Sequence, residues 1–357
     1  MSQHGKRSVV LARYLALAWC GLIVYASLHP FAGWRDTGVS PWAFIEGAWP
    51  RYWTLFDLVA NVAVYLPLGL FLTLGLHRLP GRYSTAIVAT LLAAGLSFGL
   101  ETLQNWLPSR VPSNLDLACN SAGGLLGALW AHLVGPRIFA RLESTAHRLL
   151  APVPHGELGL TLLGLWMIVP LSPETLLFGA GDLRQLFGLT PALPFSSEHY
   201  ALIEAGITAC NAVGVGLILG YLAARRWIAC LAVPLFLLLG LAVRMLGTAV
   251  LIGPGEAMAW WTPGARQGLQ VAAAILLVAL WLPARAALAL AALTLFAGTV
   301  LVNLAPPNPY SEAALAAWRQ GHFLNFNGLT RLVASLWPFL ALPFLLLTLR
   351  GGAGRST

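Results

Sequence analysis

Charged residues are scarce in this sequence: only 10% of its 357 residues are Asp, Glu, Lys or Arg, whereas 58% are hydrophobic. Soluble domains have about 25% charged and roughly 45 to 50% apolar residues. The composition therefore excludes an ordinary soluble domain. Lys is nearly absent, and the net charge of +8 comes from arginine. Membrane proteins gather such charge in their cytoplasmic loops, so no nucleic-acid partner is predicted.

Cysteine is also scarce, and the motifs of common enzyme classes are missing. The four cysteines, Cys20, Cys119, Cys210 and Cys230, lie in apolar segments without CxxC spacing. They indicate neither a disulfide framework nor a zinc site. The sequence has no HExxH zinc helix, no Walker phosphate loop and no GxSxG nucleophile elbow. We therefore expect no metal and no cofactor.

The sequence does contain a series of apolar runs of about 20 residues, each long enough to cross a hydrocarbon core of about 30 Å as a helix. They predict an all-α fold, a polytopic transmembrane helix bundle with about ten spans, although about nine or eleven would also fit the short run 267–283. The first run lacks a small-x-small cleavage site and is interpreted as an uncleaved helix. The runs lie near residues 9–28, 55–76, 84–107, 114–135, 158–178, 199–224, 227–252, 267–283, 284–304 and 328–349.

A basic segment, residues 136–157, is the best domain boundary and carries Arg137, Arg141 and Arg148. It separates a four-helix membrane domain, residues 1–135, from a six-helix membrane domain, residues 158–357. With this linker and the amino terminus inside, most Lys and Arg residues near helix ends fall on the inside, as in cytoplasmic loops. We expect a multi-pass protein of the bacterial inner (cytoplasmic) membrane with both termini cytoplasmic. The basic linker suits contact with anionic membrane lipids.

The predicted outer loop, residues 29–53, is rich in aromatic residues, among them Trp34, Trp42, Trp49 and Trp53. Tryptophan is enriched where membrane and water meet. The favoured interpretation is therefore a loop lying at the level of the lipid headgroups, and the alternative is a lid that faces a substrate.

Polar residues in the first four predicted helices form three pairs, each an acid and an amide three or four positions apart. Such spacing places both members of a pair on one helix face. Because ionisable groups in a membrane helix are costly, they usually face the bundle interior or water. The pairs are Asp57 with Asn61, Glu101 with Gln104, and Asp116 with Asn120.

The expected topology brings all three pairs to the outer face, with Arg110 beside them as a counter-charge. Asp57 and Asp116 could instead act as helix caps, since Asp is preferred at helix starts. Glu101 lies near a helix carboxyl end, where capping does not explain an acid, and is therefore the sharpest functional candidate. Asp57 and Asp116 both begin an Asp-Leu-x-x-Asn pattern, which indicates a short internal repeat.

In the second half of the chain, polar residues again favour the predicted outer ends of the helices. We expect Arg244 to pair with Glu204, because a lone buried charge is costly, and the alternative is that Arg244 binds an anionic headgroup. Asn327 is expected to cap the last helix. Arg331 is a further candidate on that helix.

The ordered motifs of the first four helices closely resemble the VanZ-like family over about residues 10–135. They are FDLVANVAVYLPLG (Phe56–Gly69), GLETLQ (Gly99–Gln104), Arg110 and LDLACNSAGGLLG (Leu115–Gly127). The family's recurring elements match here at Asn61, Pro67, Leu68, Gly69, Glu101, Gln104, Arg110, Asp116, Asn120 and Gly124. The resemblance implies a membrane architecture in the cell envelope and an association with glycopeptide resistance, notably to teicoplanin. It does not imply a reaction, and the six-helix remainder is an extension outside it.

The expected function is to engage a lipid-linked envelope component, such as a cell-wall or glycan precursor, or a lipoglycopeptide, at the outer face of the inner membrane. Two other classes stay open. A membrane enzyme could use the carboxylates for acid–base chemistry on a lipid-linked glycan or phosphate. A proton-coupled transporter could use them as relays, but polar groups are too few at the inner ends to form a continuous path.

Overall fold

The computed structural model describes residues 3–76, 83–134, 145, 148–188, 194–306 and 324–351. The chain divides into two compact units, Met1–Thr145 (unit 1) and Ala146–Thr357 (unit 2), and this division falls within the predicted linker segment 136–157. The described residues are helical or irregular and form no strand, apart from an isolated bridge between Leu150 and Ala223. The predicted all-α fold is confirmed.

Seven helices among the described residues are long and apolar enough to cross a membrane. The other three of the ten predicted runs form helices that are shorter or less apolar than these seven. α5 (Asn114–Leu133) has the length of a span but is less apolar because of its Asn, Asp and Gly residues, α11 (Pro263–Ala279) has 17 residues, and α7 (Gly156–Trp166) has 11. The seven are Arg7–Leu28, Leu55–Gly75, Ser84–Gln104, His199–Leu222, Arg226–Leu251, Ala284–Leu304 and Gly328–Arg350.

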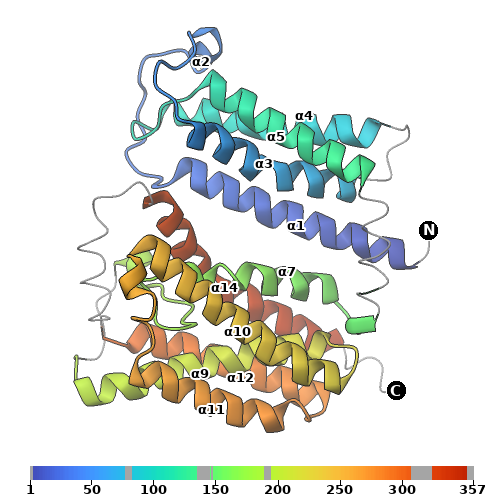
Figure 1. Cartoon of the computed structure of the whole chain (residues 1–357), viewed down its shortest axis with the longest axis vertical. Helices are drawn as coiled ribbons and strands as arrows, with labels where there is room; N and C mark the ends of the chain where they lie inside the picture. Colours follow the sequence, from blue (N-terminus) through green and yellow to red (C-terminus); the bar gives the residue numbers. More distant parts are fainter. Residues whose placement is uncertain are drawn as a thin grey trace. The chain divides into compact units, whose positions relative to one another are not determined.

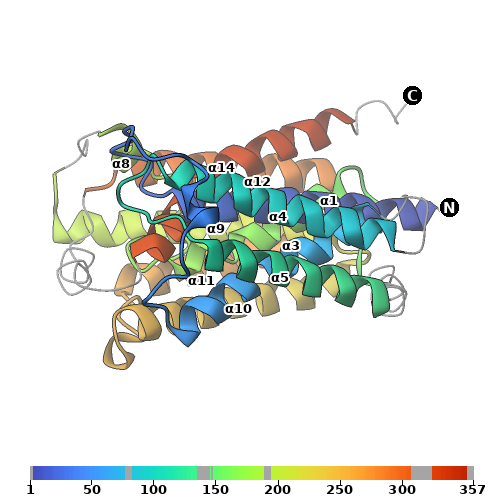
Figure 2. The same cartoon turned by 90° about the horizontal axis from the view of Figure 1, so that it is seen from above.

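Unit 1 is built from four long helices that lie along a common direction (Figures 1 and 2). They are α1 (Gln3–Leu28), α3 (Leu55–Gly75), α4 (Ser84–Gln104) and α5, and a short helix, α2 (Ala43–Glu46), lies in the long connection before α3. α3 and α5 both begin at the end of the unit where α1 and α4 finish. We call this end of unit 1 the polar end.

Glycines allow α3 and α5 to pack backbone against backbone. A side chain at Gly127 would overlap the carbonyl oxygen of Leu66, and one at Gly123 would overlap that of Val62. Small residues spaced four apart permit this close approach of membrane helices. The contact fixes the two helix starts side by side at the polar end.

In the described part of unit 2, six helices have 11 or more residues. Figure 1 shows how they are arranged, and the core that they form includes Trp166 and Trp337. Besides α7 and α11 they are α9 (Ser197–Leu222), α10 (Arg226–Leu251), α12 (Ala284–Leu304) and α14 (Leu324–Gly351). α11 packs on α9 through Gly268, where a Cβ would lie 2.6 Å from the carbonyl oxygen of Ala205. A four-residue helix, α8 (Arg184–Phe187), precedes α9.

The run predicted as a helix over 158–178 is only partly helical. The α-helix ends at Trp166, a 3-10 turn spans Val169–Leu171, and the chain then continues as an irregular segment to Leu183. Proline explains the break, because Pro170 and Pro173 lack the N–H that a helix needs and disfavour helical geometry in the residue before them. Much of the irregular segment is nonetheless buried.

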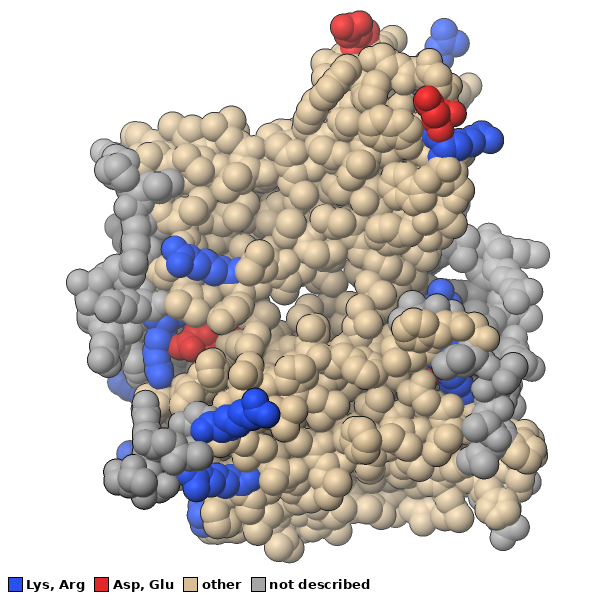
Figure 3. Space-filling view, turned by 180° about the vertical axis from the view of Figure 1, so that it is seen from behind, with Lys and Arg blue, Asp and Glu red and all other residues tan. Residues whose placement is uncertain are grey.

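The surface carries few charged side chains. The space-filling view shows wide areas without Asp, Glu, Lys or Arg over the helices of either unit (Figure 3). Many large apolar side chains are exposed there, such as Leu17 and Leu277, each more than 70% exposed. Contiguous apolar surface of this kind marks a membrane-facing protein.

Candidate functional site

The start of α3 is a complete capping box. The hydroxyl of Thr54 accepts a hydrogen bond from the backbone N–H of Asp57 (3.1 Å), and the carboxylate of Asp57 accepts one from the backbone N–H of Thr54 (3.0 Å). This reciprocal pair satisfies two donors that a helix start leaves open. Asp57 is exposed, and its geometry matches the capping alternative that its position allowed.

The start of α5 has the same pattern but different partners. Ser113 accepts from the backbone N–H of Asp116 (3.2 Å), as Thr54 does for Asp57. The backbone N–H of Ser113, however, donates to the carboxylate of Glu101 on α4 (2.8 Å). Asp116 is thereby released from the box, and its carboxylate accepts from the side-chain amide of Asn61 on α3 (2.9 Å).

This arrangement corrects the expectation that capping cannot account for Glu101. Glu101 lies in the last turn of α4, which ends at Gln104, but its carboxylate caps the start of α5, where the positive end of the helix dipole favours an acid. Its side chain is only 4% exposed. The spacing of residues in the sequence shows on which helix Glu101 lies, but it does not show which neighbouring helix its side chain contacts. The contact with the start of α5 was therefore missed.

Arg110, expected as the counter-charge of the acids, bonds instead to the end of α1. Its guanidinium donates to the carbonyl oxygens of Ala26 (2.9 Å) and His29 (2.9 and 3.2 Å). Open carbonyls and the negative end of the dipole make a helix carboxyl end a favourable place for a cation. Burial lowers the pKa of the Arg110 guanidinium. Among the described residues Arg110 forms no ion pair.

The amides of the other two pairs join helices within unit 1. Gln104 donates to the carbonyl oxygen of Ser27 (2.9 Å), and Asn120, which is buried, donates to the hydroxyl of Ser97 on α4 (2.9 Å). The carbonyl oxygen of the Asn120 side chain has no hydrogen-bond partner within the described residues. These amides therefore position α1, α4 and α5 around the polar end.

The three acids nevertheless lie close enough to interact. The carboxylate of Asp116 interacts electrostatically with both Asp57 and Glu101. Asp116 is half-buried, so it is less solvated than Asp57 but more accessible than Glu101. The polar end therefore presents acceptor oxygens and negative charge. The nearby guanidinium of Arg110 is hydrogen-bonded to carbonyl oxygens at the end of α1. No group of His, Cys, Asp or Glu in the described part of the chain could hold a metal ion.

The aromatic connection before α3 is held at the polar end by the turn between α4 and α5. Asn105 donates to the carbonyl oxygen of Val39 (3.2 Å), and Asn114 donates to that of Gly47 (2.7 Å). The ring of Trp42 stacks on Phe98 of α4, with centroids 5.3 Å apart. Asn105 and Asn114 were missed because a lone amide near a helix end carries no distinguishing sequence signal.

Large apolar side chains remain exposed where this connection enters α3. Trp49 is 64% exposed, Tyr52 95%, Leu55 73% and Phe56 73%. They precede Asp57 directly in the chain, so an apolar surface adjoins the acids.

The charged candidates of unit 2 are arranged differently. Arg244 and Glu204 are 5% and 4% exposed and interact electrostatically, but the described residues show no ion pair between them. The guanidinium of Arg244 donates instead to the carbonyl oxygens of Ser172, Pro173 and Thr175. The expected pairing is therefore electrostatic and not a direct contact.

The two remaining candidates lie on α14. Arg331 contacts Glu174 of the irregular segment at 3.6 Å. Asn327 was expected to cap the last helix, but α14 already includes Leu324, so Asn327 lies inside the helix and not at its N-cap position. Its side chain lies outside the described residues.

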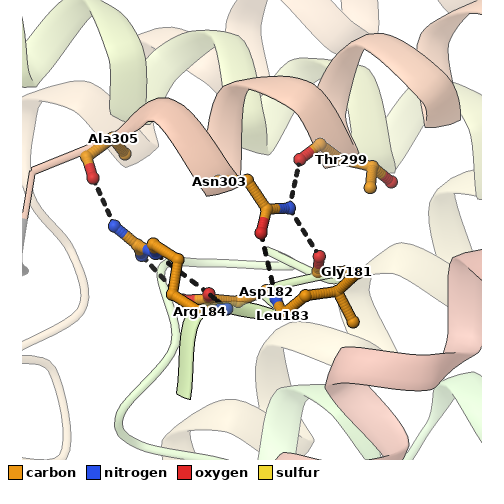
Figure 4. Close-up of polar contacts among 7 residues, drawn as sticks. All are labelled: Gly181, Asp182, Leu183, Arg184, Thr299, Asn303 and Ala305. Atoms are coloured by element: carbon orange, nitrogen blue, oxygen red, sulfur yellow. Dashed lines mark hydrogen bonds and ion pairs between the residues drawn. The ribbon is translucent and has the colours of Figure 1, made fainter. Parts of the chain in front are cut away.

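Further contacts, which the sequence gave no reason to expect, hold the far end of the irregular segment (Figure 4). Asn303 of α12 accepts from the N–H of Leu183 (3.0 Å) and donates to the carbonyl oxygen of Gly181 (2.7 Å). Arg184 forms an ion pair with Asp182 (2.7 Å) and donates to the carbonyl oxygen of Ala305.

Comparison with known proteins supports a family match for a part of unit 1. No curated protein and no solved structure matches the chain. A family model does match, and the match covers the four long helices of unit 1 and the polar end. Residues 7–135 match the VanZ/LLP1 family, as their motifs predict, and the rest of the chain is a further helical region.

Proposed function

We propose that the polar end of unit 1 binds the polar part of an amphiphile, a lipid-linked envelope component or a lipoglycopeptide, at the outer face of the bacterial inner membrane. The observation that carries this proposal is the position of Asp116. Its carboxylate is half-buried, is held by Asn61 and is not needed by the cap of its own helix, since Glu101 fills that role.

The charge at the polar end favours a particular ligand chemistry. Asp116 interacts with two further acids, and Arg110 donates only to carbonyl oxygens. A second anion placed there would be repelled, whereas hydroxyl, amide and ammonium groups can donate to the carboxylate. The ligand groups at Asp116 are therefore those of a sugar or a peptide, and not a phosphate.

The apolar part of the ligand has a matching surface. Tyr52, Leu55 and Phe56 are exposed beside Asp57, at the point where the connection enters α3. An acyl chain on this surface would leave the attached headgroup within reach of the acids. Recognition of an amphiphile thus needs no enclosed cavity.

The outer location rests on the arginine distribution, and labelling tests it. Single cysteines introduced at positions 80, 110 and 145 are expected to differ in whole cells: position 110 should react with a membrane-impermeant maleimide, and the other two only after lysis. Reaction of all three positions from one side would contradict the topology and the outward-facing site.

The binding test uses the full chain, purified in mild detergent, and mass spectrometry of the amphiphiles that it retains. Asp116→Asn keeps the size of the side chain and removes its charge. We expect at least a roughly tenfold loss of retained ligand, since hydrogen bonds to charged groups contribute about 1.5–3 kcal/mol. Asp36→Asn, an exposed acid in the aromatic connection, is the matched control.

The same measurement separates the enzyme alternative. An intact retained amphiphile supports binding. A cleaved or transferred product that accumulates with wild type but not with Asp116→Asn would replace the binding proposal with acid–base chemistry at this carboxylate.

A further inference from the structure

One end of unit 2 is rich in arginine. The helices α7, α10 and α12 begin at this end, and α9, α11 and α14 finish there (Figure 1); we call it the basic end. Figure 3 shows several basic side chains close together there. The acid described at this end, Glu157, lies in the first turn of α7, where the helix dipole favours it. The described arginines of the basic end are all exposed, and they are Arg148, Arg225, Arg226, Arg285 and Arg350.

A backbone contact holds Arg148, from the basic segment, beside the start of α10. The N–H of Ala224 donates to the carbonyl oxygen of Leu149 (2.8 Å), next to the isolated bridge. Arg148 and Arg225 directly adjoin these two bonded residues in the chain. Neither arginine side chain forms a hydrogen bond or an ion pair within the described residues. Two like charges held together repel each other, so an anion bound between them would be stabilised.

Two further arginines lie near a tryptophan. The guanidinium of Arg226 is 5.6 Å from the ring centroid of Trp281, and Arg285 follows this tryptophan in the first turn of α12. Trp281 and Trp227 are both more than half exposed. Exposed tryptophans of membrane proteins are enriched at the level of the lipid headgroups. The arginines beside them therefore lie at the depth of the lipid phosphates.

The stability of the helices does not account for these arginines. Arg225 is the N-cap residue of α10, Arg226 is its first residue, and Arg285 is the second residue of α12. The positive end of the helix dipole disfavours a cation at each of these positions, and neither helix has an acid in its first turn to offset it. A negative charge supplied from outside the chain would remove this cost.

Apolar surface adjoins the basic end on the same helices. Leu231 of α10 and Leu277 and Val278 of α11 are exposed, and they lie about a turn further into the membrane part of their helices than the arginines and Trp281. Such side chains suit contact with acyl chains. Charge at headgroup depth above an apolar surface favours a lipid over a free anion.

We propose that the basic end of unit 2 binds an anionic lipid whose headgroup carries two phosphates, of the diphosphatidylglycerol class. One phosphate lies between Arg148 and Arg225, and the other lies beside Arg226 and Arg285. Guanidinium groups bind phosphate oxygens through paired hydrogen bonds. Basic sites at the cytoplasmic ends of membrane helices bind headgroups of this kind. The pairing of the arginines distinguishes this lipid from one with a single phosphate.

The test uses the full chain, purified in a maltoside detergent, and native mass spectrometry, which counts the lipids that stay bound. The protein is titrated with tetraoleoyl diphosphatidylglycerol and, separately, with dioleoyl phosphatidylglycerol at the same total phosphate concentration. Arg148→Gln and Arg225→Gln are measured alone and combined. Arg266→Gln, at an exposed arginine near the start of α11 and so at the other end of unit 2, is the matched control.

The wild type and Arg266→Gln are expected to bind diphosphatidylglycerol roughly tenfold more tightly than phosphatidylglycerol, because each further arginine near the membrane surface adds about fivefold. Each single substitution should weaken binding of diphosphatidylglycerol roughly fivefold, and the double substitution on the order of twentyfold. Equal affinity of the wild type for the two lipids, or a double variant that binds like Arg266→Gln, overturns the proposal. The arginines lie in unit 2 and the carboxylates in unit 1, so this proposal and the proposed function can fail independently.

Discussion

The two units use charged residues at helix ends and in helices in opposite ways. In unit 1 the carboxylates accept from backbone N–H groups and an amide at the starts of α3 and α5. In unit 2 a buried guanidinium donates to the carbonyl oxygens of an irregular segment. Unit 1 therefore presents acceptors at its polar end, whereas unit 2 keeps donors in its interior.

The comparison shows that the stability of the fold can depend strongly on one charged residue and only weakly on the charge of another. Asp116 can lose its charge and keep a hydrogen bond with Asn61. Arg244 cannot be replaced without leaving several buried carbonyl oxygens unsatisfied. Charge removal should therefore impair ligand binding in unit 1 and stability in unit 2.

The largest effect is expected from Arg244→Met. The substitution strips three carbonyl oxygens of their donor, and each unsatisfied buried group costs about 1–3 kcal/mol. Thermal unfolding in detergent should show a loss of several kcal/mol or no folded protein at all. Arg226→Met, at an exposed arginine near the other end of α10, removes only a cation–π contact with Trp281 at 5.6 Å and should cost at most about 0.5–1 kcal/mol. Equal stability of the two variants would remove the distinction between the units.

Gly127→Ala should rank next. Its Cβ would overlap the backbone of α3 at Leu66, so the helices must separate, and overpacking of this kind costs about 1–3 kcal/mol or more. Gly268→Ala in unit 2, with 2.6 Å to the carbonyl oxygen of Ala205, should cost less. Gly99→Ala has open space around it and should not destabilise. A different order in thermal unfolding would show that the α3–α5 contact is looser than described.

Two substitutions of Glu101 distinguish the effect of its hydrogen bond to the start of α5 from the effect of its charge. Glu101→Ala leaves the N–H of Ser113 without its acceptor and should cost about 1–3 kcal/mol of stability. Glu101→Gln keeps an acceptor oxygen and should unfold close to the wild type. If both variants lose the same stability, the carboxylate stabilises α5 through its charge and not through this hydrogen bond.

Asp57 should give the smallest effect. Asp57→Ala removes one half of the capping box and should cost about 0.5–2 kcal/mol, whereas Asp57→Asn keeps an acceptor and should cost less. Thermal unfolding of both, with Thr54→Ala as the companion variant, measures this. An Asp57→Asn protein as unstable as Asp57→Ala would contradict the capping assignment.

The sequence predicted much of this molecule, and the exceptions have physical causes. Apolar runs of span length predicted the helices, and the expected topology, with successive helices running in opposite directions, placed Asp57, Glu101 and Asp116 at one end of unit 1. It could not show that Glu101 caps α5, because that bond crosses from one helix to the next.

Two further differences have similar causes. Arg110 was assigned to the acids by charge alone, but the open carbonyls of α1 lie nearer in the fold. Pro170 and Pro173 ended α7 early, which hydropathy alone does not register.

The most direct test of the account compares the two aspartates of the internal repeat. Amphiphile retained by wild type, Asp57→Asn and Asp116→Asn is quantified by mass spectrometry at matched protein amounts. Because Asp57 is occupied by its capping box and Asp116 is not, we predict that Asp57→Asn retains ligand within about twofold of wild type and that Asp116→Asn loses roughly tenfold or more. Equal retention by the two variants would contradict the claim that Asp116 is available to bind ligand because Glu101 caps α5 in its place.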